Sequence, residues 1–124
     1  MAKSVLIIDD EVAIHKSFAF VLKKYKLEVL HATSGIKAAK ILKENTPDLI
    51  FMDFRLPGPN GIQITKKIKS NKRLKEIPVI GITGYASEEN KKIALENGVN
   101  KILEKPFDLV EIYKTLADYG LEKD

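Results

Sequence analysis

Short apolar runs recur along the chain and predict β-strands. They are rich in valine, isoleucine and leucine, and most of them do not alternate with polar residues, which is typical of strands buried on both faces of a sheet. Polar or turn-forming residues bound each run. The expected strands are Val5–Ile8, Leu27–His31, Leu49–Met52, Val79–Thr83 and Lys101–Leu103.

The segments between these runs carry apolar residues at helical spacing. The apolar positions are Ile14, Phe18, Val21, Leu22 and Tyr25 in the first segment, Ile36, Ala39, Ile41 and Leu42 in the second, Ile62, Ile64 and Ile68 in the third, Ile93, Ala94 and Leu95 in the fourth, and Leu109, Ile112, Tyr113 and Leu116 in the fifth. Ser34 and Ser87 are suited to cap helix N-termini, and Gly98 follows the fourth segment, where a left-handed residue commonly ends a helix. Five strands that alternate with five helices predict an α/β fold, with a parallel sheet covered by helices on both faces.

The composition is typical of one globular domain. The 124 residues are 44% hydrophobic and 31% charged, and no run of 18 apolar residues is present, so we expect a cytoplasmic protein without membrane contact. The absence of cysteine excludes disulfides, thiolate metal sites and cysteine nucleophiles. The net charge of +4 comes from lysines dispersed along the sequence without interleaved aromatic residues. This dispersal favours a solvated surface, and we expect no nucleic-acid binding.

Polar and charged residues follow four of the predicted strands. Asp9 and Asp10 follow the first strand, Asp53 follows the third, Thr83 ends the fourth and Lys105 comes after the fifth. Because the carboxyl ends of parallel strands meet at one edge of a sheet, these side chains are expected to converge. The carboxylates would repel one another unless a cation lies between them. Mg²⁺, which takes oxygen ligands and keeps several waters, suits such a site better than Ca²⁺.

Simpler roles remain open for several residues. Asp10 is as well suited to cap the following helix as to bind a metal, and the simplest role for Lys105 is to balance the charge of the acids. His15 and His31 lack the spacing of a metal-binding pair, and we expect His15 on the surface of the first helix. The glycine-rich phosphate motifs of dinucleotide-binding and P-loop proteins are missing, as is the hydrolase motif G-x-S-x-G. A phosphatase of the haloacid dehalogenase kind would carry a second aspartate at the position of Arg55.

Five motifs, in order and at matching spacing, are similar to those of one family. They are Ile-Ile-Asp9-Asp10-Glu11, Pro-Asp-Leu-Ile-Phe-Met-Asp53, Leu56-Pro57-Gly58-x-x-Gly61, Pro-Val-Ile-Gly-Ile-Thr83-Gly84 and Lys105-Pro106-Phe107. The sequence strongly resembles the receiver domain of two-component response regulators, and most of all stand-alone receivers of the sporulation-phosphorelay and chemotaxis types. The resemblance covers residues 1–124 as a single receiver domain without an output domain. It implies a doubly wound, flavodoxin-like (βα)5 fold with a parallel sheet in the strand order 2-1-3-4-5.

The resemblance also implies a function. Asp53 would accept a phosphoryl group from a sensor histidine kinase or a histidine phosphotransfer protein, in a reaction that needs Mg²⁺ or, in its place, Mn²⁺. The protein would be a monomeric signalling protein, not an enzyme that acts on other molecules, and the signal would leave by docking or onward phosphotransfer. The resemblance implies that Asp10, Asp53 and the main-chain carbonyl of Arg55 bind Mg²⁺ directly and that Asp9 binds it through water. It also implies that Thr83 and Lys105 contact phosphoryl oxygens.

Three positions depart from the family pattern or modulate it. Ile102 stands where many members carry Tyr or Phe three residues before the lysine, which puts the aromatic part of the usual switch in doubt. Arg55 and Tyr85 stand two residues beyond Asp53 and Thr83, where large side chains would screen the phosphoryl group from water. We therefore expect a long-lived phosphorylated state.

The resemblance places partner docking at the start of the first helix. Ile14 and His15 would meet the helix bundle that carries the phosphohistidine, with Phe107 beside them, and the Lys105–Pro106 bond is expected to be cis. The alternative function is an unphosphorylated, receiver-like interaction module. The complete set of site residues argues against it, because degenerate receivers have usually lost one or more of them.

Overall fold

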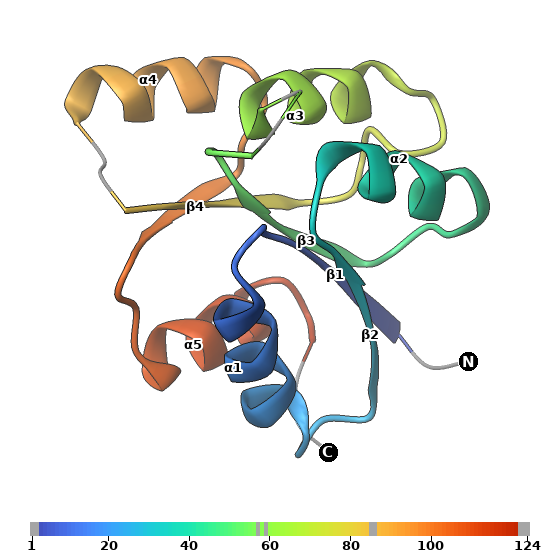
Figure 1. The fold of residues 1–124 in the computed structure, drawn as a ribbon, viewed down its shortest axis with the longest axis vertical. Helices are drawn as coiled ribbons and strands as arrows, with labels where there is room; N and C mark the ends of the chain where they lie inside the picture. Colours follow the sequence, from blue (N-terminus) through green and yellow to red (C-terminus); the bar gives the residue numbers. More distant parts are fainter. Residues whose placement is uncertain (1–2, 57, 59, 85–86, 122–124) are drawn as a thin grey trace.

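Strands and helices alternate along the chain in the computed structural model, which describes residues 3–56, 58, 60–84 and 87–121 (Figure 1). The strands are β1 (Lys3–Ile8), β2 (Leu27–Ala32), β3 (Leu49–Asp53), β4 (Val79–Thr83) and β5 (Lys101–Glu104). The helices are α1 (Val12–Leu22), α2 (Gly35–Glu44), α3 (Gly61–Ser70), α4 (Glu88–Glu96) and α5 (Leu109–Asp118). Among these helices none is long and apolar enough to cross a lipid bilayer.

The five strands form one parallel sheet in the order β2-β1-β3-β4-β5. Val5 of β1, for example, pairs with Val29 of β2 on one side and with Leu49 of β3 on the other. The chain moves outward from β1 to β2 and then returns past β1 to β3. The order of strands therefore reverses between β1 and β3, and the carboxyl ends of these two strands are where an open α/β sheet binds its ligands. The predicted flavodoxin-like fold is confirmed.

Helices cover both faces of the sheet. Helices α1 and α5 lie on one face, and α2, α3 and α4 lie on the other (Figure 1). Val5 and Ile7 belong to the hydrophobic cluster under α1 and α5, whereas Leu6 and Ile8 belong to the cluster under the other helices. Because both sets of side chains are fully buried, β1 needs an uninterrupted apolar sequence instead of an alternating one.

The observed strand ends differ slightly from the predicted ones. β1 begins two residues earlier, at Lys3, and β2, β3 and β5 each end one residue later than expected. The added residue of β3 is Asp53, so the site begins inside the sheet. β2 lies at the edge of the sheet, and only Ala32 within it is buried, so burial on both faces was wrong for this strand.

The predicted helix ends are confirmed in three cases. Ser34 and Ser87 each accept a hydrogen bond on the side-chain oxygen from the amide three residues later, at 3.2 and 3.1 Å. Gly98 takes a left-handed conformation, with φ of +102°, directly after α4. The capping role considered for Asp10 is wrong, because Glu11 occupies the N-cap position of α1 and its side chain makes no capping bond.

Candidate functional site

Four carboxylates gather where β1 and β3 end. Asp9 and Asp10 follow β1, and Asp53 is the last residue of the neighbouring β3. One carboxylate oxygen from each of Asp9, Asp10, Glu11 and Asp53 lies within 4.8 Å of the others. Asp9 is fully buried and Asp53 is 4% exposed, whereas Asp10 and Glu11 are exposed. The predicted convergence of the three aspartates is confirmed.

Main-chain amides and one close glycine fix the two buried carboxylates. The Oδ1 of Asp9 accepts a hydrogen bond from the amide of Glu11 at 2.8 Å, and the Oδ1 of Asp53 accepts one from the amide of Arg55 at 2.9 Å. Gly61, at the start of α3, lies against the main chain of Asp53 and Phe54, where a Cβ atom would be 2.9 Å from the Phe54 Cα. The residue at position 61 must therefore be a glycine for α3 to approach the end of β3 this closely.

Lys105 supplies the positive charge of the site. Its Nζ lies 2.8 Å from the Oε1 of Glu11, 3.0 Å from the Oδ2 of Asp9 and 3.5 Å from the Oδ2 of Asp53. The amide of Lys105 donates to the carbonyl of Thr83 at 2.7 Å, which holds the residue beside the end of β4. The Lys105–Pro106 peptide bond is cis, as expected.

Burial and neighbouring charges perturb the proton affinities of these groups. Burial raises the pKa of Asp53 from 3.8 to about 6; the amide of Arg55 and the ammonium of Lys105 oppose this rise, and Asp9 and Asp10 add to it. For Lys105, burial disfavours the charged form, but the hydrogen bond to Glu11 and the close carboxylates of Asp9 and Asp53 outweigh it and raise the pKa. Asp53 is therefore mostly ionised at neutral pH, and Lys105 is fully charged.

The donor set fits a divalent cation. The Oδ2 of Asp9 is buried and accepts no hydrogen bond from the described residues, although the Lys105 ammonium lies 3.0 Å away. We take this contact as a charge attraction that leaves the lone pairs of Oδ2 without a directed donor. Four carboxylates and one ammonium carry a formal charge of −3, and oxygen ligands of this kind are those that Mg²⁺ prefers. The residues present therefore fit Mg²⁺.

The sequence analysis did not assign Glu11 to the site. Its side chain makes the shortest contact of Lys105, at 2.8 Å, and joins the carboxylate cluster. The only sequence signal was its position directly after Asp9 and Asp10. An exposed acid at the start of a helix is common without any such role, so this signal was weak.

Thr83 and Ile102 border a small cavity next to the carboxylates. The cavity has a volume of about 190 Å³, and its lining includes Phe54, Arg55, Thr83 and Ile102. Thr83 ends β4 and is 4% exposed, and Ile102 in β5 is half-buried. Arg55 is exposed, and the predicted modulating residue Tyr85 lies outside the described residues.

His15 is not the surface residue that the sequence predicted. It is buried, at 8% exposed, and its Nε2 lies 2.7 Å from the carbonyl oxygen of Asp9. Its Nδ1 lies 2.7 Å from the Nδ1 of His31. A carbonyl oxygen only accepts hydrogen bonds, so Nε2 carries a proton, and the two Nδ1 atoms share a hydrogen bond whose direction depends on the tautomers of the two rings. Lost solvation and the neighbouring His15 both lower the pKa of His31.

The other two residues predicted to dock a partner pack against the same side of the core. Ile14 and Phe107 are half-buried and pack against the hydrophobic cluster between α1, α5 and the sheet. The ring of Phe107 is 5.7 Å from that of Phe18, which lies deeper in the same cluster. Both residues therefore contribute to the core with one part of the side chain and leave the other part accessible.

Comparison with known proteins identifies the family. The sequence pattern of the response regulator receiver domain matches residues 5–117. The chain belongs to this family. The polar-differentiation response regulator DivK of Brucella ovis is 31% identical over 119 residues, which are 96% of this chain and 97% of DivK. This receiver domain is therefore one of the signalling proteins of two-component systems.

Solved structures agree with this assignment. The chemotaxis protein CheY4 of Vibrio cholerae superposes with a TM-score of 0.87 at 28% identity, over 96% of this chain and 99% of that one. The receiver domain of a sensor histidine kinase from Pseudomonas aeruginosa superposes with a TM-score of 0.86 at 25% identity, over 96% of this chain and 98% of that one. The latter structure holds a magnesium ion in its active-site cleft.

Proposed function

We propose that Asp53 accepts a phosphoryl group from a phosphohistidine on a sensor histidine kinase or a histidine phosphotransfer protein. The observation that carries this proposal is a nearly buried, ionised carboxylate surrounded by three further acids and one ammonium. In the transfer, a carboxylate oxygen of Asp53 forms a bond to phosphorus as the bond from phosphorus to the donor imidazole nitrogen breaks. The electron pair of that bond returns to the imidazole.

The acidic cluster would hold the metal ion. Asp10, Asp53 and the main-chain carbonyl of Arg55 would bind Mg²⁺ directly, and Asp9 would bind it through water, with Mn²⁺ as a substitute. When bound, Mg²⁺ neutralises charge on the transferring group. The Oδ2 of Asp9, which lacks a directed donor, supports a cation at this place.

The remaining residues orient the reacting groups. The amide of Arg55 already holds the Asp53 carboxylate in one orientation, at 2.9 Å. The ammonium of Lys105, which lies 3.5 Å from Asp53, would bind one phosphoryl oxygen, and the hydroxyl of Thr83 would bind another. Ion pairs with Glu11 and Asp9 keep Lys105 charged and confined to the site, so it needs little rearrangement to reach the phosphoryl group.

The phosphohistidine donor would dock beside the site on α1 and the segment after β5. We assign this role to Ile14 and Phe107, whose accessible parts lie on that side of the core. The docking role predicted for His15 is not retained, because its ring is buried under hydrogen bonds to Asp9 and His31. His15 instead supports the main chain that carries Asp9.

The exposed side chain of Arg55 would slow hydrolysis of the phosphorylated state, together with Tyr85. The test is to replace both residues with alanine and to time the loss of phosphate. We expect faster loss from the double variant, and an unchanged lifetime would contradict the role.

The experiment for the phosphoacceptor is intact mass spectrometry of the wild type and Asp53→Asn after incubation with Mg²⁺ and acetyl phosphate. We expect the mass of one phosphoryl group to be added to the wild type only, and no addition in EDTA. An equal gain in both proteins would overturn the assignment of Asp53. No gain in a folded wild type, with either acetyl phosphate or a phosphorylated histidine phosphotransfer protein, would favour the interaction module instead.

The complete site is the reason why we do not favour the interaction module. A monomeric state, a cytoplasmic location and a single receiver domain over residues 1–124 stay predictions.

A further inference from the structure

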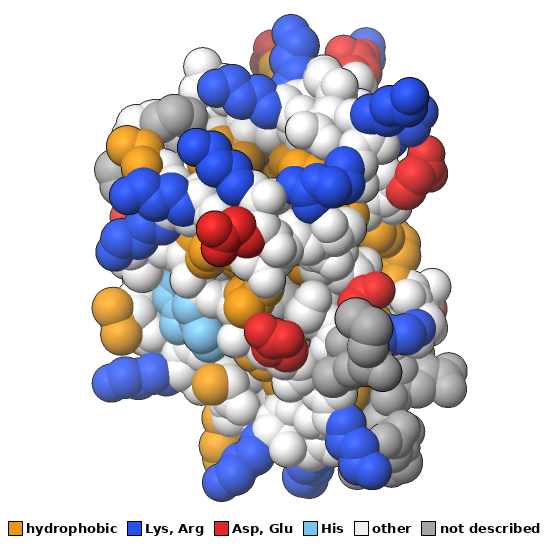
Figure 2. Space-filling view, turned by 90° about the vertical axis from the view of Figure 1, so that its right-hand side faces the viewer, with side chains coloured by type: hydrophobic (Ala, Val, Ile, Leu, Met, Phe, Trp, Pro, Cys, Tyr) orange, Lys and Arg blue, Asp and Glu red, His pale blue; other side chains and the backbone are white. Residues whose placement is uncertain are grey.

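The fold gathers positive charge on one face of the molecule. Helices α2 and α3 and the segment 71–77 that follows α3 carry nine lysine and arginine residues and two glutamates. Their net charge is +7, although the whole chain carries +4, so the rest of the chain carries −3. Lysine and arginine side chains accordingly crowd the upper half of the face shown in Figure 2. The lysines are dispersed along the sequence, but the fold brings two separate segments together and so concentrates positive charge on one face.

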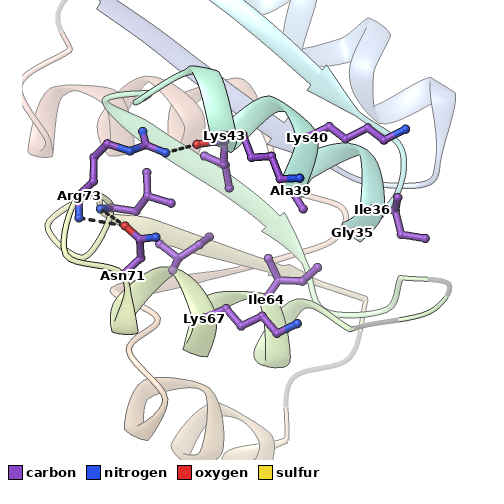
Figure 3. Close-up of a pocket in the computed structure, with 12 residues that line it drawn as sticks. Gly35, Ile36, Ala39, Lys40, Lys43, Ile64, Lys67, Asn71 and Arg73 are labelled. Carbon is purple, nitrogen blue, oxygen red and sulfur yellow. Dashed lines mark hydrogen bonds between the residues drawn. The ribbon is translucent and has the colours of Figure 1, made fainter.

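A groove runs between α2 and α3 within this basic face. Its volume is about 450 Å³, and its lining combines apolar side chains with lysines from both helices (Figure 3). Ala39 of α2 and Ile64 and Ile68 of α3 are among the apolar residues. Ile36, at the start of α2, also lines the groove and is 64% exposed. Ile36 and Ala39 are therefore accessible from solvent, whereas Ile64 and Ile68 are buried at the floor of the groove.

One end of the groove is held rigidly. Arg73 donates hydrogen bonds to the carbonyl oxygens of Leu42 and Asn45 at the end of α2, the second at 3.1 Å. Asn71 accepts bonds on its Oδ1 from the amides of Arg73, at 2.9 Å, and Leu74, at 3.2 Å. These bonds tie the segment after α3 to the end of α2, so the groove exists before any partner binds.

The lysines along the groove are not used for internal ion pairs. Lys40 and Lys43 of α2 and Lys67 of α3 line it, and none of them forms an ion pair with an acidic side chain in the described part of the chain. Figure 3 shows Lys40 and Lys43 on one side of the groove and Lys67 on the other. Two cationic walls with an apolar strip between them complement a ligand that is apolar along one side and acidic along its flanks.

We propose that this groove docks an acidic amphipathic helix of a partner protein. The apolar stripe of such a helix would lie against Ile36, Ala39 and Ile64, and glutamate or aspartate residues on its flanks would pair with Lys40, Lys43 and Lys67. A ten-residue helix such as α2 is about 15 Å long, so three turns of a partner helix match the length of the groove. This surface lies on the helices that cover the sheet, and its use does not depend on phosphorylation of Asp53.

Two other classes of partner fit less well. A single-stranded nucleic acid would use aromatic side chains for stacking, and none of the described residues that line the groove is aromatic. An anionic membrane is flat, and its acyl chains would reach the exposed Ile36 but not the recessed Ile64, which is 8% exposed. A helix reaches such a recessed strip with its own side chains.

The test uses the full chain and two fluorescein-labelled, N-acetylated 14-residue peptides of identical composition. One carries leucines at i, i+3, i+4 and i+7 with glutamates on the flanks, and the other has the same residues in an order without an apolar stripe. Fluorescence anisotropy gives the affinities, and ¹⁵N–¹H correlation spectra locate the binding site. We expect the amphipathic peptide to bind with a Kd on the order of 10 μM at low salt and to shift amides of α2 and α3, with at least about fivefold weaker binding of the other peptide.

Three variants separate the groove from general charge. Lys40→Glu/Lys67→Glu should weaken binding at least about tenfold, whereas Lys92→Glu/Lys114→Glu, with the same charge change at exposed positions of α4 and α5, should weaken it less than about threefold. Ala39→Phe fills the groove without removing core atoms and should abolish binding.

Several results would overturn the proposal. Equal binding of the two peptides, or equal weakening by the two charge-reversed variants, would show that only net charge is recognised. Amide shifts confined to elements other than α2, α3 and the segment 71–77 would place the peptide elsewhere. Absence of binding up to about 1 mM peptide would also reject the proposal, since a Kd above about 1 mM corresponds to a binding free energy of no more than about 4 kcal/mol. Tighter binding of a DNA or RNA oligonucleotide, or of vesicles containing anionic lipid, would assign the basic face to a different class of partner.

Discussion

The raised pKa of Asp53 predicts that this carboxylate reduces the stability of the metal-free protein. Its folded-state pKa is about 6 and its ordinary value is 3.8, and the residue is 4% exposed. A group with a raised folded-state pKa contributes stability below pH 4, and this contribution is lost as the pH rises through 6. Asp53→Asn removes the charge and should therefore stabilise the protein at pH 8 in EDTA.

The magnitude follows from the difference between the two pKa values. About two pKa units correspond to about 3 kcal/mol, and solvent at the open edge of the sheet screens part of this, so we expect a gain of about 1–3 kcal/mol. For a chain of 124 residues, 2 kcal/mol raises the melting temperature by about 8 °C. The Asn side chain can still accept the hydrogen bond from the amide of Arg55, so the geometry of the loop should persist.

The assay is urea unfolding of wild type and Asp53→Asn in EDTA from pH 4 to pH 8. The two proteins should be equally stable near pH 4, and the difference should grow through pH 6 and become constant above pH 7. Mg²⁺ at ten times its Kd should stabilise the wild type by about 1.4 kcal/mol and so reduce the difference. Glu28→Gln, which removes an exposed acid from β2, should change stability by less than about 0.5 kcal/mol at every pH. A difference that is absent at pH 8, or that does not vary with pH, would refute the reasoning.

Three further predictions concern the support of the site and its partner. Gly61→Ala should destabilise the protein by about 1–3 kcal/mol in urea unfolding, because the Cβ meets the main chain of Asp53, whereas Gly84→Ala has no atom within 4 Å of the Cβ and should have little effect. Ile14→Ala should slow phosphotransfer from a phosphohistidine protein at least about fivefold and leave the rate with acetyl phosphate unchanged; equal loss of both rates would contradict a docking role. Because its pKa is lowered in the folded state, His31 contributes stability above pH 6.5 that is lost as the pH falls. Between pH 7 and pH 5, His31→Gln should therefore lose less free energy of unfolding than the wild type. Parallel curves of unfolding free energy against pH would exclude this role.

The sheet was predictable because burial on both faces leaves a clear signal in the sequence. The residues of β1, β3 and β4 are almost all fully buried, so their apolar runs are uninterrupted. β2 lies at the edge of the sheet and is only partly buried. This partial exposure follows from its place in the sheet, which a pattern of residues does not give without the topology. Topology itself came from the resemblance to the receiver family.

The site was predictable in the same way, because its main residues come directly after buried strands. Asp53, Thr83 and Lys105 lie at or just beyond the ends of β3, β4 and β5. The contact between His15 and His31 was not predictable, because it depends on how α1 packs over the end of β2. Sixteen positions separate these histidines in the sequence, and no periodic pattern relates a helix to the edge strand that follows it.

Charge is distributed unevenly over the molecule, which the net charge of the whole chain does not show. A chain with +4 overall holds +7 on α2, α3 and the following segment, and −3 elsewhere. Four of the carboxylates that make up this opposite charge lie at the carboxyl edge of the sheet, where a divalent cation fits. The two regions therefore attract ligands of opposite sign, and at low ionic strength each will influence the approach of charged partners to the other. If an acidic helix binds between α2 and α3, its affinity should fall with added salt. Added salt should have a much smaller effect on the partly buried contacts of Lys105 with Asp9 and Asp53.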